Sequence, residues 1–194
     1  MRKNIIYSLL LVVAALFAGC ESRLDIEKHG NMGDQNDFYQ TDEQTEQAVA
    51  SMYSSLKGLY YNWFFTKNLL SDDVWCGGGQ RGDNTSLEQL NEYTYGTDNG
   101  MIQGVFSGLY GLIYQSNLVI EKVADDTPVK KRAIAEAKFF RAWANFELVT
   151  LWGTAPLVDH LLEPGEYRQG NSTPEALWAA VESDLNDAIS MNAL

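Results

Sequence analysis

The stretch AEAKFFRAWANFELVTLWGTAPLV, residues 135–158, carries more large apolar side chains than one face of a surface helix requires. Spacings of three and four residues place Ala137, Phe140 and Ala144 in one apolar row. A second apolar row consists of Phe139, Trp143 and Phe146, and a third, polar row consists of Lys138, Arg141 and Asn145. The two apolar rows predict an inner helix with two neighbours in a stacked helical array, which ends at Gly153.

Two helices are predicted ahead of this stretch. A capping box opens a helix over residues 42–60, and the apolar cluster that follows continues it after a break near residues 60–62. A wide apolar stripe predicts a second helix over residues 101–124. This helix ends ahead of Pro128, because the residue before a proline is displaced from the helical region. The helix that contains the stretch quoted above, over roughly residues 129–152, then forms its antiparallel partner.

A last helix is predicted near the end of the chain. Either Thr173 is its N-cap with Pro174 at the first helical position, or Ser172 and Glu175 form a capping box. Its apolar stripe reaches Ile189 without a following helix to cover it, which indicates that the chain is a fragment. The helices together predict an all-α protein of tetratricopeptide-like helical pairs, interrupted by a long loop rich in glycine and aspartate.

The N-terminus has the pattern of an export signal. A positively charged start precedes an apolar run over residues 5–18, which is shorter than the roughly 20 residues of a membrane span. The sequence Leu16-Phe17-Ala18-Gly19-Cys20 resembles a lipobox and predicts cleavage before Cys20 and lipidation of its thiol. A plain secretory signal that contains a cysteine is the alternative. We therefore expect a signal peptide (1–19), a lipidated tether (20–37) and a helical domain (38–194).

The mature chain is strongly acidic. Loss of residues 1–19 removes two basic and no acidic side chains, so the formal net charge falls from −12 to −14. Nucleic acid is a poor partner for such a chain, because affinity for it comes from neutralising phosphates. With Cys20 lipidated, Cys76 is the only other cysteine, so no intrachain disulfide is expected. No histidine lies near Cys76 in the sequence to activate it as a nucleophile.

The order of these features resembles the SusD/RagB family of outer-membrane lipoproteins of Bacteroidetes. The lipobox, tether and first helix are followed by a glycine-rich loop after Ser71-Asp72-Asp73, then by LYGLIYQSNLVIEKV and the opening stretch. The resemblance implies a surface-exposed binding protein, without enzymatic activity or cofactor. Such a protein delivers glycans or other nutrient oligomers to a TonB-dependent transporter of the SusC type. Family members are longer, so this chain resembles their N-terminal part.

The loop over residues 71–100 is the expected place for ligand binding. Loops of this length in compact domains tend to be functional or disordered. Aromatic rings stack on the apolar faces of sugars, and Asp, Asn and Arg side chains hydrogen-bond sugar hydroxyls. The loop offers this mixture in the candidate glycan-binding residues Asp72, Asp73, Trp75, Arg81, Asp83 and Asn84. The alternative is a solvated insertion in which Trp75 packs back onto the helices.

Other functions have weaker support in the sequence. Four aspartates, Asp72, Asp73, Asp83 and Asp98, could bind calcium, but the regular ligand spacing of an EF-hand is absent. No hydrolase motif occurs, and no carboxylate pair lies in a setting that would raise its pKa. A tetratricopeptide-like scaffold that holds other envelope proteins together remains the alternative to a glycan-binding protein.

We expect Cys20→Ser to abolish membrane retention, because the acyl chains that anchor the protein attach to this thiol. Detergent partitioning of the expressed protein measures the retention. Cys76→Ser is the matched control and should remain with the membrane. Retention of the Cys20→Ser variant would contradict the lipobox interpretation.

Overall fold

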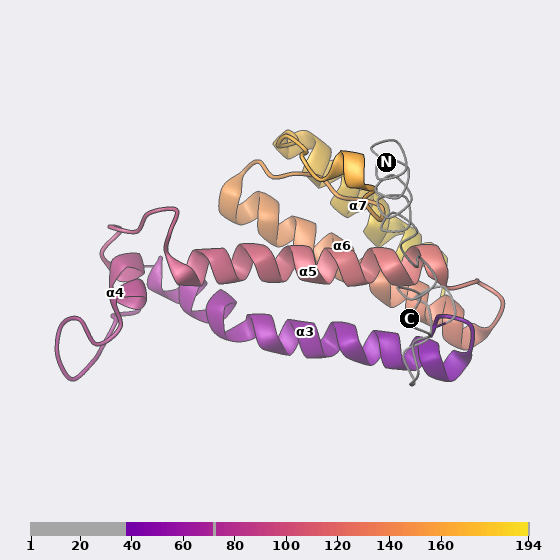
Figure 1. The fold of residues 1–194 in the computed structure, drawn as a ribbon, viewed down its shortest axis with the longest axis horizontal. Coiled ribbons are helices and arrows are strands. Elements are labelled where there is room, and N and C mark those ends of the chain that lie inside the picture. The colour runs from indigo at the N-terminus through magenta and orange to yellow at the C-terminus, as the bar shows by residue number, and fades with distance from the viewer. Residues whose placement is uncertain (1–37, 72, 194) are drawn as a thin grey trace, which may run out of the picture. The chain divides into compact units, whose positions relative to one another are not determined.

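Four long helices form the framework of the structure (Figure 1). The computed structural model describes residues 38–71 and 73–193, so the predicted signal peptide and tether, with Cys20, lie outside the described residues. The long helices are α3 (Asp42–Leu69), α5 (Gly100–Lys122), α6 (Pro128–Trp152) and α7 (Pro174–Ser190). Two short elements lie between them, α4 (Thr85–Asn91) and the 3-10 helix η2 (Pro164–Glu166). The predicted all-α class is confirmed for the described residues.

Each long helix begins at a residue whose side chain accepts a hydrogen bond from the first turn. Thr41, Asn99, Thr127 and Thr173 hold these N-cap positions. Such a cap satisfies backbone N–H groups that have no partner within the helix. At α7 the N-cap is Thr173 and Pro174 lies in the first turn, which confirms the first of the two predicted starts.

α3 runs without interruption through residues 60–62, where the sequence predicted a break. The predicted break was wrong, because none of these three residues is a glycine or proline that would disrupt the hydrogen-bond ladder. Instead, Tyr60 packs against Phe64 and Tyr61 against Phe65, with ring centroids 5.6 and 4.8 Å apart. Contacts between side chains four residues apart stabilise a helix.

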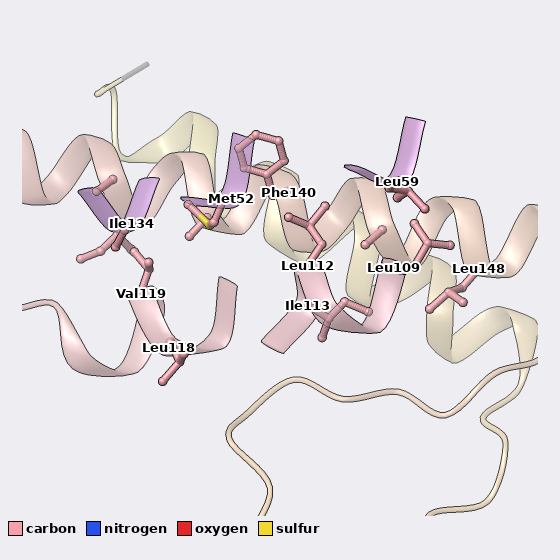
Figure 2. Close-up of a cluster of buried hydrophobic side chains, with 14 of the residues drawn as sticks. Met52, Leu59, Leu109, Leu112, Ile113, Leu118, Val119, Ile134, Phe140 and Leu148 are labelled. Atoms are coloured by element: carbon pink, nitrogen blue, oxygen red, sulfur yellow. The ribbon is translucent and has the colours of Figure 1, made fainter. Parts of the chain in front are cut away.

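α6 lies at the centre of the packing and contacts α3, α5 and α7. α5 and α7 run antiparallel to α6, whereas α3 runs parallel to it (Figure 1). The first apolar row of α6 is buried, including Ala137, Phe140, Ala144 and Leu148. Figure 2 shows this core, to which α3 and α5 contribute Met52, Leu59, Leu109, Leu112 and Ile113. α6 therefore has three neighbours, one more than predicted.

The second apolar row of α6 is only partly covered. Trp143 packs against Trp63 of α3 and Phe146 against Trp178 of α7, with ring centroids 6.2 and 5.7 Å apart. Phe139 and Phe146 nevertheless remain 46% and 37% exposed. These aromatic residues therefore form part of the surface of the described domain.

The polar row of α6 carries a buried ion pair. Arg141 donates from Nε and Nη2 to the two carboxylate oxygens of Asp184 on α7, each at 2.7 Å. Its Nη1 donates to Asn117 Oδ1 of α5 at 2.8 Å and to the Asp159 carbonyl oxygen at 2.6 Å. The side chains of Arg141 and Asp184 are only 10% and 7% exposed. One guanidinium group thus joins α6 to α5, to α7 and to the segment that connects α6 with α7.

α6 ends at the predicted position because Gly153 adopts a φ of 74°. Residues with a side chain rarely adopt this left-handed conformation, so glycine is favoured here. The N–H of Gly153 donates to the carbonyl oxygen of Val149 at 2.9 Å. Beyond it, Ala155 forms an isolated β-bridge with Ser172, which places the start of α7 beside the end of α6.

We expect Arg141→Ala to lower the free energy of unfolding by about 3–5 kcal/mol, because it leaves the buried Asp184 carboxylate without its partner. Lys138→Ala is the matched control on the same row. Lys138 pairs with Asp187 at 2.6 Å, but Asp187 is 52% exposed. Its loss should cost less than about 1 kcal/mol. Urea unfolding measures both changes, and equal losses would contradict a special role for Arg141.

Candidate functional site

The segment between α3 and α5 contains a helix that the sequence analysis did not predict. The side chain of Asn84 caps α4 by accepting a hydrogen bond from the Leu87 N–H at 3.3 Å. Leu87 and Leu90 are buried against Leu69 near the end of α3. The interpretation of residues 71–100 as one long loop was therefore wrong. Its abundance of glycine masked a short helix that is stabilised by its cap and by tertiary packing.

The glycine-rich turn ahead of α4 is held by two carboxylates. Asp83 Oδ2 accepts hydrogen bonds from the N–H groups of Gly79 and Gln80, at 2.6 and 3.0 Å. The N–H of Gly82 donates to Glu88 Oε1 of α4 at 2.7 Å. Three backbone N–H groups of the turn are therefore hydrogen-bonded to carboxylates, and the bond to Glu88 connects the turn to α4.

A cavity of about 270 Å³ lies between this turn and α4. It is lined by Trp75, Cys76, Gly77, Gly78, Gln80, Arg81, Glu88, Asn91 and Glu92. Trp75 is 80% exposed, so the interpretation in which its ring packs back onto the helices is wrong. An exposed indole ring beside a polar cavity offers a surface on which a ligand ring can stack.

Arg81 is held in place by a bidentate ion pair. Its Nη1 and Nη2 lie 2.7 Å from the two carboxylate oxygens of Glu92, the residue that follows α4. The hydrogen bond and charge of Glu92 raise the pKa of the guanidinium group, which stays charged. The pair fixes the plane of the guanidinium group, and α4 thereby orients a donor at the cavity wall.

The predicted candidate residues take different positions around this cavity. Trp75 and Arg81 line it. Asp83 and Asn84 instead stabilise the turn and cap α4. Asp73 is exposed and precedes the cavity-lining residues in the chain. The structure therefore brings Trp75 and Arg81 together at the cavity. Asp83 and Asn84 instead hydrogen-bond backbone groups of the turn and of α4.

Three cavity residues on or next to α4 were missed by the sequence analysis: Glu88, Asn91 and Glu92. Asn91 also accepts a hydrogen bond from the Cys76 N–H at 2.9 Å. The signal that could have found them is Asn84 as an N-cap, followed by residues three and four apart on one helix face.

The thiol of Cys76 is poorly suited to act as a nucleophile. Desolvation, followed by the charges of Glu88 and Glu92, raises the pKa of this thiol above its ordinary value. Thiolates are activated by positive rather than negative surroundings. The Cys76 side chain therefore stays protonated at neutral pH and serves as part of the cavity wall.

The four aspartates considered as calcium ligands do not come together as a metal site in the part of the chain that the structure describes. Asp72 lies outside the described residues. Across residues 38–71 and 73–193, no three histidine, cysteine or acidic side chains come close enough to hold one metal ion. Asp83 Oδ2 already accepts two backbone hydrogen bonds.

Among the helices of the described residues, none is long and apolar enough to cross a membrane.

Comparison with known proteins identifies the family. A family model described as "Starch-binding associating with outer membrane" matches residues 26–192. The chain belongs to the SusD-like family. The family resemblance found in the sequence is thereby confirmed, and so is the helical fold that it implied.

SusD-like relatives match nearly the whole chain. A SusD-like protein of Bacteroides ovatus is 32% identical over 198 residues, which cover 94% of this chain and 34% of the relative. A SusD-like protein of Formosa agariphila is 28% identical over 189 residues, which cover 96% of this chain and 37% of the relative. The chain thus spans about a third of the length of these curated relatives.

Solved structures of SusD-like proteins share the arrangement of helices. A laminarin-binding SusD-like protein is 27% identical, with a TM-score of 0.71 over 79% of this chain and 34% of its own. A SusD superfamily protein of Bacteroides vulgatus is 24% identical, with a TM-score of 0.69 over 79% of this chain and 35% of its own. The latter similarity establishes the fold alone.

We expect Asp83→Ala to loosen the glycine-rich turn, because the N–H groups of Gly79 and Gln80 lose their acceptor. Amide hydrogen exchange should quicken at these residues, while the free energy of unfolding changes by less than about 0.5 kcal/mol. Asp73→Ala, an exposed aspartate of the same segment, is the control and should leave exchange in the turn unchanged. Unaltered exchange in Asp83→Ala would contradict the role of this carboxylate.

Proposed function

We propose that this chain binds neutral glycans, as part of a surface lipoprotein that delivers them to a TonB-dependent transporter of the SusC type. The observation that carries the proposal is the cavity beside Trp75, whose ring is 80% exposed and lies next to fixed polar groups. Membership of a starch-binding family and similarity to a laminarin-binding protein support it. The protein acts by binding and not by catalysis.

The side chains around the cavity match the needs of a sugar. The Trp75 ring provides a stacking surface for the apolar face of a pyranose. Arg81, Asn91 and Gln80 provide donors, and Glu88 provides an acceptor, for sugar hydroxyls. Because Arg81 is paired with Glu92, its donors are held in position before a ligand arrives.

Charge favours a neutral glycan over an anionic one. The cavity is lined by one guanidinium and two carboxylate groups, and the guanidinium is already paired with one of them. The formal net charge of the whole chain is −12. Uronate or sulfate groups would therefore meet uncompensated negative charge. We expect laminarin, a neutral glucan, to bind better than polygalacturonate.

The location and the transporter partner are part of the same proposal. In this proposal, lipidation of Cys20 anchors the protein to the outer membrane, with the helical domain exposed at the cell surface. Association with the outer membrane is a property of the matched family. A binding protein on this surface needs a transporter to bring its ligand across the membrane, which a TonB-dependent receptor of the SusC type supplies.

A scaffold for other envelope proteins is the second candidate function. It is favoured by an apolar cavity of about 280 Å³ between α3 and α6, lined by Leu56, Leu59, Tyr60, Trp63, Phe139, Phe140 and Trp143. Aromatic surfaces of this kind are enriched in protein interfaces. Glycan binding that depends on Trp75 would decide in favour of the first function.

We expect Trp75→Ala to weaken laminarin binding roughly tenfold, because the stacking surface contributes about 1 kcal/mol or more. Isothermal titration calorimetry on the purified chain measures the change. The melting temperature should stay the same, since the ring is exposed and supports no core packing.

Tyr167→Ala is the matched control for this experiment. Tyr167 is also an exposed aromatic residue, at 67%, but it follows η2 and does not line the cavity. Its removal should leave the affinity for laminarin unchanged. Equal affinity of the original chain and Trp75→Ala would remove this cavity from the glycan site.

A further inference from the structure

The ring of Trp75 receives little support from contacts of its own. It is 80% exposed, so few protein atoms lie against it. A tryptophan side chain turns about two bonds, and the direction of its Cα–Cβ bond limits what the ring can reach. That direction is set by the backbone of residue 75. The position of the ring beside the cavity therefore depends on what holds this backbone.

The side-chain amide of Asn91 holds the backbone on both sides of Trp75. Its Oδ1 accepts a hydrogen bond from the Cys76 N–H at 2.9 Å. Its Nδ2 donates to the carbonyl oxygen of Val74 at 3.4 Å, a longer and weaker bond. The Val74 carbonyl belongs to the peptide group before the Trp75 Cα, and the Cys76 N–H belongs to the peptide group after it. One amide thus restrains the two peptide planes that define the backbone conformation of Trp75.

The other bonds of the glycine-rich turn leave Trp75 unsupported. Asp83 and Glu88 bind N–H groups only from residue 79 onwards. Residues 74–78 form neither helix nor strand, so a backbone ladder does not hold them either. The Asn91 amide takes the place of a neighbouring strand, because a primary amide offers an acceptor and donors side by side.

Asn91 is itself fixed by apolar packing outside the cavity. It is the last residue of α4. The preceding Leu90 is 0% exposed, and together with Leu87 it packs against Leu69 of α3. This packing holds the end of α4 in place without help from the cavity residues. Asn91 therefore connects the backbone of Trp75 to a position that the helices already determine.

The amide of Asn91 can serve a ligand as well. Its nitrogen carries two N–H donors, and the bond to Val74 uses one of them. Among the described residues the second donor has no hydrogen-bond partner, so it is available for a sugar hydroxyl. Asn91 can therefore raise glycan affinity in two ways, directly through this donor and indirectly through Trp75.

We propose that Asn91 is a positioning residue for Trp75, whose amide fixes the backbone of residue 75 so that the ring stands at the cavity before a glycan arrives. The inference rests on the proposed glycan-binding function and adds a residue that acts on affinity through another side chain. A group that is ordered in the free protein loses less conformational freedom on binding, which raises affinity.

Asn91→Ala tests the positioning, because it removes both bonds and leaves a strong helix former at the end of α4. In the unliganded full chain, NMR relaxation should show the backbone order parameter of Trp75 falling from about 0.85 to about 0.6 or below. Trp75→Ala assigns the signal. Asn68→Ala is the matched control, since the Asn68 amide bonds only the Phe64 carbonyl within α3, at 2.7 Å. An unchanged order parameter in Asn91→Ala would overturn the proposal.

A double-mutant cycle in calorimetric titration with laminarin separates the two actions of Asn91. Asn91→Ala should weaken binding about tenfold in the original chain. In the Trp75→Ala chain it should weaken binding only about threefold, because no ring is left to position and only the direct hydrogen bond is lost. Equal factors in the two chains would show that Asn91 acts on the ligand without Trp75 and would reject the positioning role.

The melting temperature of Asn91→Ala should fall by less than about 4 °C, because Leu87 and Leu90 still hold α4. A larger fall, with a lower order parameter at Leu87 as well, would show that Asn91 stabilises α4 and would also reject the proposal. If Trp75→Ala binds laminarin weakly and Asn91→Ala binds it like the original chain, the positioning role fails and the glycan site stands. If Trp75→Ala binds as tightly as the original chain, the glycan site is rejected together with the positioning role.

Discussion

The buried guanidinium group of Arg141 is the constraint on which the helical arrangement depends. A charge removed from water is tolerated only when its donors are satisfied. Arg141 meets this requirement with acceptors from Asp184 on α7, Asn117 on α5 and the Asp159 carbonyl. α5, α7 and the segment between α6 and α7 therefore meet at Arg141. Apolar packing of α6 against α3 and α5 forms the core of the same helices (Figure 2).

Two cavities follow from how this framework holds the segment between α3 and α5. Packing of the long helices fixes both ends of the segment, and α4 docks through Leu87 and Leu90 onto the end of α3. One cavity is then formed between α4 and the turn that contains Trp75, and the other between Tyr95 and the end of α6. Their linings differ, since charged groups surround only the first. The segment thus provides two surfaces of different chemistry.

Helix boundaries were predictable where local signals agree. The cap at Thr173 and the left-handed Gly153 mark the start of α7 and the end of α6 in the sequence as they do in the structure. The prediction failed for α3 and α4, where local signals compete with packing. The aromatic cluster near Tyr60 resembled a break, and the glycine-rich context concealed the short helix after Asn84. Of the candidate site, Trp75 and Arg81 were recognisable by type, whereas their partners on α4 were not.

The sequence by itself determined the helical class, the family resemblance and the positions of most helix ends. These properties depend on side-chain spacing and on caps within a few residues, which are local interactions. Only the tertiary structure decided that Arg141 is a buried connector and that Glu88, Asn91 and Glu92 line the cavity beside Trp75. Both facts depend on residues distant in the chain, because burial and hydrogen-bond partners are set by which helices pack together.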